Sequence, residues 1–177
     1  LASAGLDNRN GTLGSITGSG EIDAGAGTIN NQNGTIAVAQ DLGITAAALL
    51  NTQGEVAAGR ALAVHTTATI DNAQGALSAG QQLILNASQI DNAAGAIGSV
   101  NAALEITARD GNLDNAAGRI EALKTVSLSA FGIANTDGTI VGQSLAANSN
   151  GLAFANTRGK LVATGAELAD TLSIESG

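Results

Sequence analysis

Hydrophobic and polar residues follow a pattern that returns about every 20 residues along the whole chain. Within each unit, apolar side chains stand at alternate positions, as in Leu42 and Ile44 or Leu62 and Val64. Alternation with a period of two predicts short β-strands with one buried face. Two or three such strands, separated by polar or glycine-containing corners, fill a unit of this length and leave no room for an ordinary helix.

Each unit is marked by an asparagine and a glycine three positions after it, and the asparagines are 23, 20, 21, 20, 23, 20 and 21 residues apart. An apolar residue stands two positions before each asparagine, and another stands two positions after each glycine. Eight consecutive matches identify a repeat protein. The pairs, which we interpret as the structural corners of the repeat, are Asn8 and Gly11, Asn31 and Gly34, Asn51 and Gly54, Asn72 and Gly75, Asn92 and Gly95, Asn115 and Gly118, Asn135 and Gly138, and Asn156 and Gly159.

The length of the unit selects one repeat architecture. Leucine-rich, ankyrin and tetratricopeptide units each need a helix, and hexapeptide and nonapeptide solenoids have a different period. A coil of 20–23 residues with three strand segments fits an all-β fold, a parallel β-helix of about eight coils, formed by residues 1–177 as a single block. Neither end carries the polar cap that solenoids need, so we expect the array to continue beyond both ends.

The corner residues have a mechanical interpretation. Asparagine at the start of a turn can bond the backbone two residues on, and glycine can adopt the left-handed conformation at the corner. Stacking should place equivalent asparagines about 4.8 Å apart, where their amides form a ladder that fixes the register. The residues before the asparagines should point outward; they include Asp7, Asn30, Asp71, Asp91 and Asp114.

Departures from the regular unit predict where the coils bulge. The two 23-residue units place extra residues around Ile16–Glu21 and around Arg109-Asp110-Gly111, where Asp-Gly favours a turn. At the other end, Ile174-Glu175-Ser176 lies 20 residues after Asn156 and is expected to repeat the asparagine corner with serine.

Composition supports a narrow, repetitive core, since the chain has two Phe and no Trp, Tyr, Met, Cys or Pro. A net charge of −8 without basic clusters argues against nucleic acid and anionic membranes as partners. No apolar run is long enough to span a bilayer as a helix. The absence of cysteine excludes disulfides and thiolate metal sites.

Candidate chemistry is sparse, and we expect no catalytic, cofactor-binding or metal site. His65, the only histidine, follows Val64 on a predicted strand and should face solvent, with no second His or Cys to share a metal. Gly18, Gly20, Gly25 and Gly27 lack the Lys-Ser/Thr and the helix of a phosphate loop, which favours turns. A column of Asp71, Asp91 and Asp114 could hold calcium or act as acid and base, but a solvated face is the expected role.

The segments Leu6-Asp7-Asn8-Arg9-Asn10-Gly11-Thr12-Leu13 and Ile70-Asp71-Asn72-Ala73-Gln74-Gly75 resemble the haemagglutinin repeat of filamentous-haemagglutinin-type exoproteins. The resemblance implies a long right-handed parallel β-helix, exported by two-partner secretion through an outer-membrane transporter. It also implies a secreted or cell-surface location, and a role as an adhesin or as the stick that carries a toxin in contact-dependent growth inhibition. The partner would then be a receptor on a host or neighbouring cell. The chain has no Pro, so it lacks the family's Asn-Pro secretion motifs, and it shows no toxin-like domain.

Two function classes remain open at this stage. A structural or adhesive shaft segment, monomeric as a fragment, is the leading hypothesis. The alternative is a polysaccharide-active or carbohydrate-binding β-helix. Regular coil lengths favour the shaft, because catalytic β-helices build their clefts from long loops.

Overall fold

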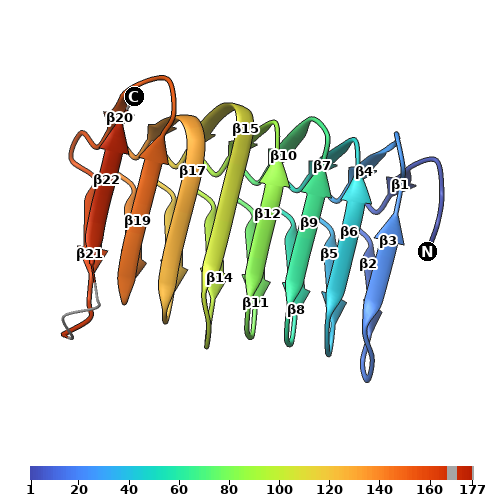
Figure 1. The fold of residues 1–177 in the computed structure, drawn as a ribbon. Coiled ribbons are helices and arrows are strands. Elements are labelled where there is room, and N and C mark those ends of the chain that lie inside the picture. Colours follow the sequence, from blue (N-terminus) through green and yellow to red (C-terminus); the bar gives the residue numbers. More distant parts are fainter. Residues whose placement is uncertain (167–170, 177) are drawn as a thin grey trace.

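The computed structural model describes residues 1–166 and 171–176, in which the chain winds as a parallel β-solenoid of about eight turns (Figure 1). The coils lie side by side in chain order from the N-terminal to the C-terminal end. We number them 1–8 by their asparagines, from Asn8 in coil 1 to Asn156 in coil 8. The described residues contain no helix, and therefore none that could cross a membrane. The all-β repeat fold predicted from the sequence is confirmed.

One face is an eight-stranded parallel sheet to which every coil gives the strand that follows its glycine. Its order is the order of the chain, because each coil stacks on the one before. The strands are β2 (Thr12–Ser15), β5 (Thr35–Val38), β8 (Glu55–Ala58), β11 (Ala76–Ala79), β14 (Ala96–Ser99), β16 (Arg119–Ala122), β18 (Thr139–Gly142) and β21 (Lys160–Ala163).

The other fourteen strands form a second sheet with two rows. One row is β3 (Gly20–Asp23), β6 (Leu42–Ala46), β9 (Leu62–Thr66), β12 (Leu83–Ala87), β15 (Leu104–Asp114), β17 (Thr125–Ala134), β19 (Ser144–Ser149) and β22 (Leu172–Ser176). The row leading into the asparagines is β1 (Leu6–Asp7), β4 (Thr28–Asn30), β7 (Ala48–Leu50), β10 (Thr69–Asp71), β13 (Gln89–Asp91) and β20 (Phe154–Ala155). The long strands β15 and β17 run through both rows and join them.

The register places equivalent residues of successive coils directly beside one another. Leu77 pairs with Val56 and Ile97, and Ile90 pairs with Ile70 and Leu113. Inward-facing side chains therefore form continuous apolar columns, and the buried hydrophobic core consists of Ala, Val, Ile and Leu. The buried hydrophobic core of the described residues contains no aromatic side chain, as the composition led us to expect.

The extra residues of the long units lie only partly where the sequence suggested. In coil 1 one extra residue falls between Ser15 and Gly20, and two more fall between Asp23 and Thr28. In coil 5 two extra residues form a register shift after Ala108, at Arg109–Gly111, and one lies between Ser99 and Leu104. The sequence pattern concentrated each insertion at one corner, whereas the ladders show that different corners share it.

The expectation for the C-terminal segment is wrong. Ile174 pairs with Ala147, and Ser176 pairs with Ser149, so the segment continues the row of β19 instead of forming a ninth asparagine corner. Leu172 follows Ala163 by nine positions, whereas the paired residue Leu145 follows Gly142 by three. The longer connection shifts the register, and so the spacing of 20 residues from Asn156 does not locate a corner.

Candidate functional site

The asparagine ladder predicted from the sequence is present along all eight coils. The side-chain nitrogen (Nδ2) of each asparagine donates to the side-chain oxygen (Oδ1) of the next at 2.7–2.8 Å. From Asn31 to Asn135 these side chains are completely buried. A buried amide needs partners for its donors and its acceptor, and the ladder supplies them coil by coil.

Each asparagine amide also stabilises its own turn. Nδ2 lies 3.1–3.4 Å from the carbonyl oxygen of the glycine three residues later, and the glycine N–H donates to the asparagine carbonyl at 2.9–3.2 Å. The asparagine side chain therefore bonds to the backbone of the residue three positions later, and not to that of the residue two positions later as expected. The bond to the residue two positions on is made instead by the preceding side chain: Oδ1 of Asp91, for example, accepts the N–H of Ala93 at 2.8 Å.

Contrary to the expectation from the sequence, the glycines after the asparagines do not adopt the left-handed conformation. The positive φ belongs to the residue just before each glycine, with values of 54–57° at Asn10, Asn33, Gln53, Gln74, Ala94, Ala117, Asp137 and Arg158. A positive φ at the third residue of a four-residue turn is the geometry of a type II turn. Asparagine at the first two of these positions is consistent with a left-handed backbone, but alanine at two others gives no such signal.

Close stacking explains why glycine recurs. From coil 2 onward, a Cβ atom on the glycine would overlap the main-chain carbonyl oxygen of the asparagine in the preceding coil. It would also crowd the side-chain oxygen of its own asparagine, at 2.7 Å for Gly34 and 2.6 Å for Gly54 and Gly95. The glycine is thus required by the contact between coils.

The carboxylates of the aspartate column form hydrogen bonds within their own turns. Asp71, Asp91 and Asp114 pair in register, as expected, but Oδ1 of each accepts the N–H two residues on at 2.8–3.0 Å. Asp71 also accepts the hydroxyl of Thr52 at 3.0 Å. Among the described residues, no group of three or more His, Asp or Glu side chains is placed to hold a metal ion.

The remaining candidate residues take surface roles. His65 is exposed, as expected, and its Nδ1 lies 3.2 Å from the amide nitrogen of Asn86. Gly25 adopts a positive φ in a turn where Asp23 accepts its N–H at 2.8 Å. In coil 1 the side-chain hydrogen bond from Arg9 lowers the pKa of Asp7 to about 2.

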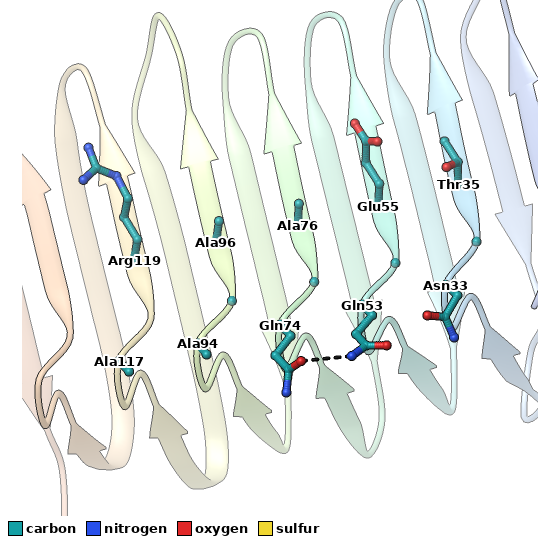
Figure 2. A pocket seen from close by; sticks show the side chains of 14 residues that line it. Asn33, Thr35, Gln53, Glu55, Gln74, Ala76, Ala94, Ala96, Ala117 and Arg119 are labelled. Carbon is teal, nitrogen blue, oxygen red and sulfur yellow. Dashed lines mark hydrogen bonds between the residues drawn. The ribbon is translucent and has the colours of Figure 1, made fainter. Parts of the chain in front are cut away.

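A groove of about 620 Å³ runs along the turns of several coils (Figure 2). Gly34, Gly54, Gly75 and Gly95 line it. Gln53 donates to Gln74 at 3.0 Å along one side. Glu55 and Arg119 stand on strands along the other side, separated by Ala76 and Ala96. The lining contains side-chain amides, the carboxylate of Glu55 and the guanidinium of Arg119, but no histidine. It therefore offers polar contacts but no hydroxyl nucleophile paired with a general base.

Comparison with known families agrees with this description. The haemagglutinin repeat matches residues 15–74 and 64–116, which together cover more than half of the chain. No curated protein and no solved structure matches the chain.

Proposed function

The chain belongs to the haemagglutinin-repeat family of filamentous-haemagglutinin-type proteins, and we propose that it is a shaft segment of a large secreted or cell-surface exoprotein. Such a shaft holds adhesive surfaces or a distal domain away from the cell. We further propose export by an outer-membrane transporter partner and a receptor on a host or neighbouring cell as the target of the parent protein.

The single observation that carries the proposal is the uninterrupted asparagine ladder over eight coils. Each coil presents the same contact to its neighbours, so length is gained by adding coils without redesigning an interface. Rungs of about 4.8 Å give eight coils a length of roughly 40 Å. A spacer needs a fixed length and resistance to bending, and stacked columns with a buried hydrogen-bonded ladder supply both.

A coil deletion tests the shaft. Removing residues 115–134, the regular coil 6, joins Asp114 to Asn135 and keeps the asparagine column in register, because Asp114 pairs with Ala134. We expect a folded chain whose maximum dimension in small-angle scattering is shorter by about 4.8 Å. As a matched control, removing residues 115–124 deletes half of that coil and should prevent folding. A chain that fails to fold after the removal of one whole coil would contradict a spacer role.

Location and adhesion need separate measurements in the bacterium that makes the parent protein. An antibody against this segment should label intact cells, and labelling should disappear when the outer-membrane transporter is deleted. Labelling only after lysis would contradict a surface role. The purified segment should not bind target cells saturably if it is a spacer; saturable binding would assign the adhesive surface to these coils.

A further inference from the structure

A further irregularity lies in coil 3, between β9 and β10. His65 and Ile70 are five positions apart, whereas their partners Asn86 and Ile90 in coil 4 are four apart. Thr45 and Leu49 in coil 2 are also four apart and pair with the same two residues. Coil 3 therefore carries one extra residue here, around Thr67 and Ala68.

The extra residue redirects a hydrogen bond between coils 3 and 4. Between coils 2 and 3, the carbonyl of Ala46 accepts the N–H of Thr67 at 3.2 Å, and Thr67 is the residue just after Thr66, the partner of Ala46. The corresponding donor for the carbonyl of Thr66 is the N–H of Ser88. That N–H donates instead to the carbonyl of Ala68, at 2.7 Å. The insertion thus deprives the Thr66 carbonyl of its ladder donor.

Arg109 supplies a donor in its place. Its Nη2 donates to the carbonyl of Thr66 at 2.7 Å, across 43 residues of sequence. Arg109 lies on β15 of coil 5, and β12 of coil 4 lies between β15 and β9. The side chain therefore reaches over a whole coil.

The bulge that carries Arg109 is anchored on coil 4. The N–H of Asp110 donates to the carbonyl of Ser88 at 3.2 Å, and the hydroxyl of Ser88 donates to the carboxylate of Asp110 at 3.2 Å. At Gly111 an added Cβ would lie 2.8 Å from the Cβ of Gln89, so the bulge lies directly against coil 4. The insertions in coils 3 and 5 thus meet over Ser88.

Other arginines behave differently. The ion pairs of Arg9 and Arg119 lie within one coil, and those of Arg60 and Arg158 join adjacent coils. We call the interface between coils 3 and 4, over which Arg109 reaches, the seam. Thr66, at this seam, also has a hydroxyl that is buried without a hydrogen-bond partner. An unsatisfied buried polar group weakens the layer that contains it.

We propose that Arg109 is a strap that closes the seam between coils 3 and 4 and makes coils 3–5 a single cooperative unit. Coils of a solenoid normally contact only their nearest neighbours, so local opening can occur at the weakest interface. A bond over a whole coil means that opening the seam also requires release of coil 5. This goes beyond a shaft of equal coils, because it assigns one segment a device against local separation.

Hydrogen exchange tests the strap. In Arg109→Met the backbone amides of Ser88 and Gln89 should exchange faster by about tenfold or more. The reason is that the substitution removes the hydrogen bond from the charged guanidinium to the carbonyl of Thr66. The amide of Gly138, in coil 7, should be unchanged. Arg60→Met, which removes an exposed ion pair with Asp41, is the matched control and should leave Ser88 unchanged. Unchanged exchange at Ser88 in Arg109→Met would overturn the proposal.

A deletion separates the strap from a general stabilising effect. Removing Thr67 should return the Ser88 N–H to the carbonyl of Thr66 and make Arg109 dispensable. Arg109→Met in the deleted chain should then cause no further acceleration at Ser88. The same acceleration with and without Thr67 would overturn the proposal. If Arg109→Met alone fails to fold, recovery in the deleted chain supports the strap, and failure there overturns it.

Discussion

The side-chain nitrogen of Asn92 lies 2.7 Å from the side-chain oxygen of Asn115, inside the buried asparagine ladder. Asn92 also accepts the amide of Asn72 at 2.7 Å. A single asparagine therefore satisfies one buried group on each side, and its loss affects two interfaces between coils.

We expect Asn92→Ala to lower the free energy of unfolding by about 2 kcal/mol or more, because two buried polar groups lose their partners. Asn8→Ala is the control, since Asn8 is only partly buried and donates to Asn31 at the start of the ladder. Its cost should be smaller. Chemical denaturation measures both, and equal losses would contradict a cooperative ladder.

The turn gives a pair of substitutions with opposite expected effects. Gly95→Ala should destabilise strongly, because its Cβ would overlap the carbonyl of Asn72. Ala94→Gly should be neutral or stabilising by up to about 1 kcal/mol, because Ala94 has φ 54° and glycine adopts that conformation without strain. Thermal unfolding compares them. If Ala94→Gly proves the more damaging change, close stacking is not what requires glycine.

Two neighbouring residues test the assignment of inner and outer positions. Ile90 is buried, and Gln89 is exposed. Ile90→Asp should cost several kcal/mol, since it places a charge between apolar columns, whereas Gln89→Asp should change stability by about 0.5 kcal/mol or less. Urea titration with a fluorescent label at each end would also show whether damage at Ile90 spreads along the array. Similar losses for both variants would contradict the assignment.

The aspartate column tests the carbohydrate-active alternative. Replacing Asp71, Asp91 and Asp114 together by Asn keeps a side-chain oxygen for each turn hydrogen bond and removes three charges. Stability should be unchanged or slightly higher, because screening acts over about 8 Å at physiological salt. Millimolar calcium should not shift the melting temperature of the unsubstituted chain. A calcium-dependent rise that the triple variant lacks would indicate a cation site.

The sequence by itself determined the repeat, the coil length, the buried columns and the asparagine ladder. These features depend on contacts between equivalent residues of successive coils, so periodicity is enough to place Ile90 beside Ile70 and Asn92 beside Asn72. The exposed position of His65 followed from the same alternation.

Only the tertiary structure decided why the glycines recur, where the C-terminal segment lies and what Arg109 does. A positive φ and a close approach both favour glycine, and only the stacked coils show that Gly95 meets the carbonyl of Asn72. Spacing cannot distinguish an asparagine corner from a shifted strand when a connection lengthens, as before Leu172. The bond from Arg109 to Thr66 joins two insertions on different coils. Insertions break the period, so the sequence pattern carries no information about which residues they bring together.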